Sequence, residues 1–260
     1  MAAVRARGGA NTTLIGVSMK RRSGIALLAV AMAAACSTDE VGPTGADPTQ
    51  SFGRMRFVNA VSDATIADRV NVIVEGTPFA INLAHSVAAP ASPTLYFPIY
   101  DGSRRIDVRR TADTAVHVLD ASIQIAANTD HTVFAVKQGV GAAVTTFTVT
   151  DNNAAPPADS VKLRVIHLAY SAGNVDVYVT APAASLTTIS PTFANVAPGT
   201  AAAYLTQRAG TYQVRLTAPG SKTAILTITT PALAAGAIRT AVALDPQTGT
   251  ALVGALLTDR

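Results

Sequence analysis

The sequence predicts an all-β protein, built as two tandem immunoglobulin-like β-sandwich domains behind an export signal and a flexible tether. Short β-type segments separated by turn residues occupy the chain from residue 53 onward. No stretch outside the N-terminal signal keeps a helical period. The order of the segments starts again near residue 161. Short strands punctuated by turns in a domain of about 100 residues are typical of a β-sandwich.

Residues 1–35 have the features of an export signal. A basic cluster at residues 20–22 is followed by an uncharged run, residues 23–35, that ends in three alanines. The run is shorter than the roughly 20 apolar residues that a spanning helix needs. Because the stretch before Met19 has no apolar face, we expect translation to begin at Met19; a long basic leader is the alternative.

The only cysteine, Cys36, directly follows the small residues of this signal. The segment resembles a bacterial lipoprotein signal, in which an aliphatic residue and two small residues precede the cysteine; here Ala33 stands where leucine is most common. The resemblance implies cleavage between Ala35 and Cys36 and lipidation of Cys36, and two or more acyl chains anchor a protein stably. It also implies an extracytoplasmic location, with the outer membrane favoured by Ser37 if the cell has one. A free or buried cysteine is the alternative.

The basic charge of the chain belongs to the signal. The net charge is +4, but five of the 20 Lys and Arg and none of the 16 Asp and Glu precede Cys36. The processed chain is therefore slightly acidic and lacks the basic balance that favours nucleic-acid binding. With no cysteine beyond Cys36, intrachain disulfides and cysteine metal sites are excluded.

Two polar segments divide the processed chain. Residues 36–52 combine the lipidated cysteine with a flexible tether, and residues 152–160 form a proline-rich linker. They delimit two predicted sandwich domains, residues 53–151 and 161–260, and each is long enough to form its own core.

The first domain contains a series of predicted strands. Residues 69–75 place alternating valines on one face, and residues 104–109 alternate apolar with charged side chains. Pro98 marks an edge strand, because proline has no N–H to donate to a neighbouring strand. Glycine-containing turns are expected at residues 76–78 and 139–141. The predicted strands are residues 54–61, 69–75, 94–99, 104–109, 116–125, 131–137 and 144–150.

The second domain repeats the first at an offset of about 106 residues, which indicates an internal duplication. Four short segments of the first domain have counterparts in the same order in the second. They are residues 56–59 with 164–167, 70–74 with 175–179, 101–102 with 209–210, and 149–151 with 257–259.

The repeats resemble tandem copies of the bacterial domain of unknown function 4397, found in exported and lipid-anchored proteins. The second repeat carries the family's R-V-x-H, V-D-V-Y-V and A-G-x-Y-x-V segments at residues 164–167, 175–179 and 209–214. The first repeat departs from them, with Asn59 in place of the histidine and Asn71 in place of the aspartate. The resemblance implies an extracytoplasmic sandwich and carries no assigned activity.

The combination of residues that most resembles a catalytic site is the polar pair of His167 and Asp176, with Ser171 between them in the sequence. Ser–His–Asp arrangements hydrolyse acyl bonds, but these residues lack a nucleophile elbow, and the first repeat lacks both His and Asp. We therefore interpret His167 and Asp176 as a structural hydrogen-bonded pair and predict no catalytic residues.

No metal site and no cofactor are predicted. His85, His117 and His131 fall on different segments, whereas zinc needs three or four convergent ligands. The aspartates lack the spacing of a calcium loop. The arginines at residues 104–105 and 109–110 could meet an anionic glycan or lipid headgroup, but a charged, solvated edge strand is the simpler interpretation.

Together these features predict a lipid-anchored cell-envelope protein that is not an enzyme and acts as a binding, adhesion or structural module. The expected partners are the membrane, through the anchor, and an envelope glycan or protein. The alternative is an envelope enzyme accessory or hydrolase subunit with a site near His167 and Asp176. The sequence does not define the oligomeric state.

Overall fold

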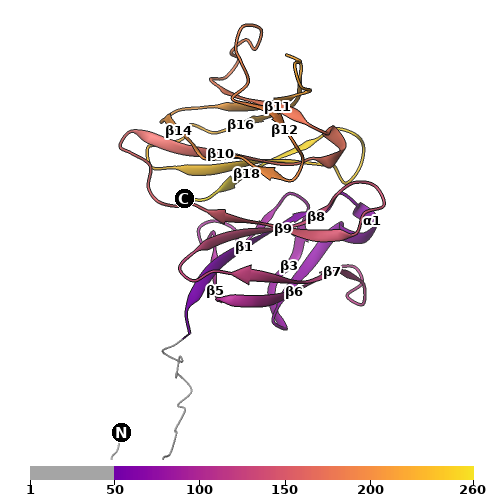
Figure 1. Ribbon diagram of the computed structural model, residues 1–260. Coiled ribbons are helices and arrows are strands. Elements are labelled where there is room, and N and C mark those ends of the chain that lie inside the picture. Colours follow the sequence, from indigo (N-terminus) through magenta and orange to yellow (C-terminus); the bar gives the residue numbers. More distant parts are fainter. Residues whose placement is uncertain (1–49) are drawn as a thin grey trace, which may run out of the picture. The chain divides into compact units, whose positions relative to one another are not determined.

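The computed structural model describes residues 50–260, which lie in one compact unit (Figure 1). The predicted signal, the start at Met19, the cleavage site between Ala35 and Cys36 and most of the tether lie outside the described residues. No helix within residues 50–260 is long and apolar enough to cross a membrane.

Strands dominate the described chain, and its two helical segments are one turn each, α1 (Ala64–Ala67) and the 3-10 segment η1 (Tyr170–Ala172). The structure confirms the predicted all-β sandwich fold. In the first sandwich, one sheet has the order β4-β1-β8-β9, with β5 also paired to β1, and the other has the order β3-β2-β6-β7. The strands are β1 (Phe52–Ala60), β2 (Arg69–Val74), β3 (Thr77–Ala84), β4 (Ala88–Ala89), β5 (Phe97–Tyr100), β6 (Gly102–Arg110), β7 (His117–Ile125), β8 (Asp130–Lys137) and β9 (Val144–Asp151).

The second sandwich has the same strand order as the first. One sheet runs β13-β10-β17-β18, with β14 also paired to β10, and the other runs β12-β11-β15-β16. Its strands are β10 (Ser160–Leu168), β11 (Val175–Thr180), β12 (Phe193–Val196), β13 (Thr200–Ala201), β14 (Leu205–Arg208), β15 (Gln213–Thr217), β16 (Ala224–Thr229), β17 (Ile238–Leu244) and β18 (Val253–Thr258).

Each sandwich contains one parallel strand pair that the sequence did not predict. Strand β1 runs parallel to β8 and opposes Arg56 to Thr132, and β10 runs parallel to β17 and opposes Arg164 to Thr240. The sheets of immunoglobulin domains are described as antiparallel, so these pairs are a departure from that architecture. They place the first strand of each sandwich in the centre of its sheet.

The segment after β2 continues as a strand where the sequence indicated only a turn. Glu75 and Gly76 both have positive φ, at 48° and 77°, and they join Val74 to Thr77 as a two-residue hairpin. Strand β3 then forms an edge that pairs only with β2, a position that tolerates Pro78.

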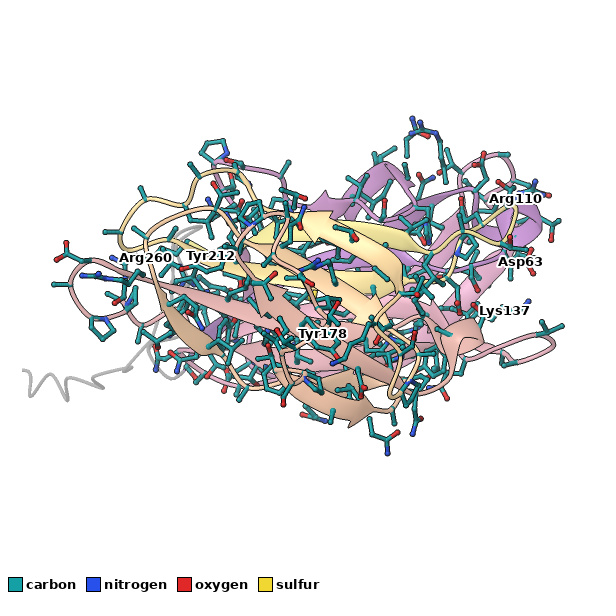
Figure 2. All side chains as sticks on the ribbon, turned by 90° about the horizontal axis from the view of Figure 1, so that it is seen from above. Asp63, Arg110, Lys137, Tyr178, Tyr212 and Arg260 are labelled. Atoms are coloured by element: carbon teal, nitrogen blue, oxygen red, sulfur yellow. The ribbon has the colours of Figure 1, made fainter. Side chains whose placement is uncertain are left out.

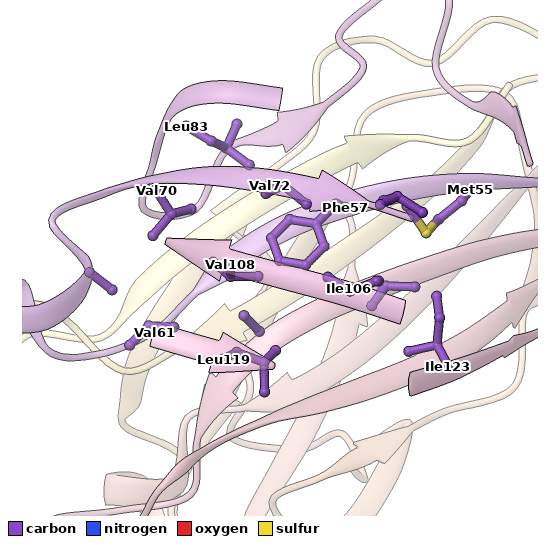
Figure 3. Close-up of a cluster of buried hydrophobic side chains, with 14 of the residues drawn as sticks. Met55, Phe57, Val61, Val70, Val72, Leu83, Ile106, Val108, Leu119 and Ile123 are labelled. Carbon is purple, nitrogen blue, oxygen red and sulfur yellow. The ribbon is translucent and has the colours of Figure 1, made fainter. Parts of the chain in front are cut away.

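Each sandwich has its own apolar core. In the first, Met55 and Phe57 of β1 pack with Ile106 and Val108 of β6 on the opposite sheet (Figure 3). In the second, Val165 of β10 takes the corresponding position. Alternate residues of β1 and β10 therefore face inward, as the two-residue period of a strand requires.

A third apolar cluster joins the two sandwiches. It contains Val58 and Phe134 from the first sandwich and Ile166 and Val242 from the second. The sheets that contain β1 and β10 therefore pack face to face, and the structure has four sheet layers (Figure 1). We call the two contacting surfaces the inter-sandwich faces.

Candidate functional site

His167 and Asp176 do not form the predicted pair. His167 lies on β10 and shares a 2.9 Å hydrogen bond from Nε2 to the Gly173 carbonyl oxygen, while burial lowers its pKa. Asp176 lies on β11 and accepts from the backbone N–H groups of Asn195 and Gly220, both at 2.8 Å. The prediction was wrong because β10 and β11 belong to different sheets, so the two residues are not cross-strand neighbours.

Ser171 is also engaged elsewhere, since its hydroxyl and backbone N–H both donate to Asp245. No group of three His, Cys, Asp or Glu side chains in residues 50–260 could hold a metal ion. His131 accepts a 3.0 Å hydrogen bond from the Ala126 N–H, and His117 contacts Asp107 at 2.9 Å. These histidines have local partners in the fold.

Two of the four arginines of the predicted patch, Arg105 and Arg109, are paired with aspartates. Arg105 forms a two-bond ion pair with Asp120, at 2.8 and 2.6 Å. Arg109 donates to Asp107 at 2.8 Å. Arg104 donates from Nε to the Tyr100 carbonyl oxygen at 2.9 Å. The ion pairs therefore offset about half of the patch's positive charge.

A buried polar cluster lies between the two inter-sandwich faces. Arg56 donates from Nε to the Thr132 hydroxyl at 2.9 Å, from Nη1 to the Thr258 carbonyl oxygen at 2.7 Å and from Nη2 to Asp259 at 2.5 Å. Its guanidinium lies 4.7 Å from the ring centroid of Tyr96. Burial raises the pKa of Asp259. Arg56 is 1% exposed, so the cluster is inaccessible to a ligand.

The second sandwich makes the equivalent contacts through Arg164. Arg164 donates to the hydroxyl of Thr240, to the carbonyl oxygen of Thr150 and to the carboxylate of Asp151. Its guanidinium lies 4.6 Å from the ring of Tyr204. Every partner is shifted by 108 residues, as in Arg56 and Arg164, Tyr96 and Tyr204, Thr132 and Thr240, Thr150 and Thr258, and Asp151 and Asp259. We call these ten residues the Arg–Asp cluster.

The accessible site that the sequence did not reveal is an aromatic groove in the first sandwich. It lies between the edge strands β3 and β5 and has a volume of about 350 Å³. Phe52, Phe97 and Tyr100 line it, and they are the only exposed Phe or Tyr residues within residues 50–260, at 42%, 52% and 44% exposure. Because exposed aromatic surface is costly in water, its concentration in one groove indicates a contact surface.

The aromatic rings are held in fixed positions. Phe52 stacks on Tyr100 with ring centroids 4.4 Å apart, because β1 and β5 oppose the two residues in register. Phe97 packs edge to face against Phe79 at 6.2 Å. The stacked pair and the perpendicular pair form two walls of the groove, which Pro78 and other apolar side chains complete.

The charged groups at the rim are already bound. Arg104 donates to the backbone of its own turn, and a Glu75 carboxylate oxygen accepts a 2.6 Å hydrogen bond from the Arg105 N–H. The groove therefore offers chiefly apolar contacts.

The second sandwich has no equivalent of this groove. The register that opposes Phe52 to Tyr100 in the first sandwich opposes Ser160 to Arg208 in the second. A position-by-position comparison of the two repeats, with attention to the aromatic residues within 96–100, could have indicated this site from the sequence.

A larger open cleft of about 780 Å³ lies where the two sandwiches meet. Its charged groups are paired with one another or with neighbours. Asp63 contacts Lys137 at 2.7 Å, at one end of the molecule (Figure 2), and Asp245 accepts from Ser171. The aromatic groove is therefore the stronger candidate site.

Comparison with known proteins gives a match to one family model over part of the chain, and no activity. Residues 53–178 match DUF4397, a domain of unknown function. The matched region covers the first sandwich and continues through β10 into β11 of the second. No curated protein matches the chain.

Among solved structures, the Bacillus anthracis TIE protein is similar at 10% sequence identity and a TM-score of 0.21. The match covers 74% of this chain and 33% of that protein, so the chain spans about a third of its length. The DUF4397 match remains the informative comparison.

Proposed function

We propose that this protein is a lipid-anchored binding module of the bacterial cell envelope, in which the aromatic groove of the first sandwich contacts the ligand. The observation that carries the proposal is the gathering of all exposed Phe and Tyr side chains of residues 50–260 in that one groove. Aromatic side chains contribute large contact areas at little entropic cost, and they dominate binding energies.

The anchor part of the proposal rests on the N-terminal sequence. The basic cluster, the short apolar run and Cys36 together support export, cleavage before Cys36 and attachment to the membrane, with the outer membrane favoured. The matching strand orders further support the proposal that the second sandwich is a diverged copy of the DUF4397 domain.

Two other roles have less support. A hydrolase subunit near His167 and Asp176 would need these groups to converge, and each is bound to different partners. A pure spacer has no use for an apolar groove that its second sandwich lacks. The position of the groove in the first sandwich alone favours binding.

The binding proposal is tested with the processed chain, residues 36–260, carrying Cys36→Ser. The chain is screened against arrays of envelope glycans and of extended, proline-containing peptides. We expect at least one class to bind and to lose about tenfold or more in affinity with Phe97→Ala or Tyr100→Ala. Ile225→Ala, which removes an exposed apolar side chain from the second sandwich, is the matched control. No binding on either array, or binding that the groove substitutions leave unchanged, counts against the proposal.

The anchor is tested separately with the full chain in a bacterial host. We expect radiolabelled palmitate to enter the wild-type protein and not Cys36→Ser. We also expect globomycin, which blocks lipoprotein signal cleavage, to cause the uncleaved form to accumulate. Label that persists in Cys36→Ser would show that the anchor is elsewhere or absent.

A further inference from the structure

The two sandwiches can separate without breaking a sheet. Every strand pair within residues 50–260 joins strands of the same sandwich. Side chains provide the hydrogen bonds between the faces, as Arg56 does to Asp259 and Arg164 to Asp151. The covalent connection is the segment between Asp151, the last residue of β9, and Ser160, the first of β10. The sandwiches are thus complete units that share one interface.

The polar part of this interface has the organisation of a symmetric dimer. In a two-fold interface, residue i of one subunit contacts residue j of the other, and j contacts i. Here Arg56 of the first sandwich contacts Asp259 of the second, and Arg164 of the second contacts Asp151 of the first. Since each face supplies both an arginine and an aspartate, the network depends on the two faces and not on the linker.

The apolar part of the interface is asymmetric and makes the pairing specific. The first face contributes Phe134 and the partly buried Phe147, where the 108-residue shift places Val242 and Ala255 in the second. In the opposite sense, Ala60 of the first face corresponds to Leu168 of the second. Pairing two first faces would crowd the phenylalanines, and pairing two second faces would leave space, and both cost stability. A first face therefore fits a second face.

From these observations we propose that two copies of this chain form an exchanged dimer, in which the first sandwich of each copy docks on the second sandwich of the other through the Arg–Asp cluster. Within one chain, the linker gives the two faces a high effective concentration, so the closed monomer predominates in dilute solution. Shortening the linker removes that advantage, because the closed arrangement then becomes sterically strained. In the dimer each sandwich contacts the same kind of face as in the monomer, but the second copy supplies that face.

The first test removes residues 155–158 from the processed chain carrying Cys36→Ser, which keeps the contacts of residues 152–154 with Lys162 and Asp130, and measures mass by light scattering. We expect a folded dimer with the circular dichroism spectrum of the parent chain. Replacing the same segment by a Gly/Ser stretch of equal length is the control and should restore the monomer. A folded monomer, or an aggregate without native structure, from the deletion variant overturns the proposal.

The second test asks whether the dimer uses the Arg–Asp cluster. In the deletion variant, Arg56→Ala should raise the dimer dissociation constant by about 100-fold or more, because it leaves Asp259 buried without its partner. Arg105→Ala removes an exposed ion pair on β6 and should leave the constant unchanged. Equal effects of the two substitutions would place the contact on another surface.

Discussion

Arg56 of the first sandwich and Asp259 of the second form a 2.5 Å ion pair across 203 positions of sequence, and both side chains are at most 2% exposed. A buried charge that loses its partner costs about 3–5 kcal/mol, even where the intact pair itself adds little stability. The pair therefore affects the stability of the chain most strongly when one of its members is removed.

The first prediction concerns this pair. We expect Arg56→Ala to lower the free energy of unfolding by about 3–5 kcal/mol, because Asp259 stays buried without its guanidinium partner. Arg164→Ala should have a similar effect through Asp151. Urea unfolding followed by circular dichroism measures both. Arg105→Ala is the control, and its exposed pair with Asp120 should make little difference. A small effect of Arg56→Ala would mean that water reaches Asp259.

The second prediction concerns the partly buried His85 and the buried His167. Burial lowers the pKa of both His85 and His167 in the folded chain. Below about pH 6.5 the unfolded chain therefore binds protons that these two residues do not yet bind when folded. The corresponding stability is present above pH 6.5 and is lost progressively as the pH falls below it.

The test replaces His167 by the residue that the first sandwich has at the same position. His167→Asn reproduces Asn59, and it should reduce the difference between urea midpoints measured about one pH unit above and about one pH unit below 6.5. His85→Asn should add to this reduction. If the difference between the two midpoints is unchanged in the double variant, other groups account for the acid sensitivity.

The third prediction concerns Asp63, which caps helix α1 and contacts Lys137. Its carboxylate accepts from the Thr65 N–H at 3.0 Å and from Lys137 at 2.7 Å. The hydrogen bond from Lys137, with that from the Thr65 hydroxyl, lowers the pKa of Asp63 to about 2. Its stabilising contribution is therefore present above about pH 4 and is lost as the pH falls toward 2.

Two substitutions separate the cap from the ion pair. Asp63→Asn retains a good N-cap and removes the charge, so it should cost less at neutral pH than Asp63→Ala, for which about 1 kcal/mol is expected. Both variants should be less sensitive to acid than the parent chain between about pH 4 and 2. Equal losses from the two variants at neutral pH would assign the whole effect to the ion pair.

The sequence predicted the sandwich fold because alternation and turn residues are local signals. The internal repeat also matched residue 56 with residue 164, and residue 151 with residue 259. The role of these residues, however, depends on partners that lie on the other sandwich. A local pattern does not show that an arginine on a strand is buried against a second sandwich. The predicted His167–Asp176 pair failed for the related reason that the chain changes sheet between β10 and β11.

The aromatic groove was missed because its walls come from separate segments. Phe52 begins β1, Phe79 lies on β3, and Phe97 and Tyr100 lie on β5. Aromatic residues in strands ordinarily belong to a core, and only the sheet edges of the folded chain expose these.

The last prediction compares two glycines on strands with ordinary extended backbones, Gly53 on β1 and Gly254 on β18. A Cβ atom at Gly53 would lie against the Ala126 carbonyl oxygen and 2.6 Å from Ile125 Cγ2, and the carbonyl belongs to the backbone and cannot rotate away. At Gly254 the Cβ atom would lie 2.5 Å from Ile228 Cγ1, on a side chain that can change rotamer.

Because overpacking costs about 1–3 kcal/mol where the surroundings cannot relax, we expect Gly53→Ala to reach the upper part of that range and Gly254→Ala to stay near its lower end. Urea midpoints of the two variants, measured beside the parent chain, make the comparison. Since Gly53 also adjoins Phe52, the same variant should weaken ligand binding at the groove through displacement of β1, whereas Gly254→Ala should not. A larger loss of stability in Gly254→Ala than in Gly53→Ala would contradict this expectation, and would show that β1 can move away from the Ala126 carbonyl oxygen.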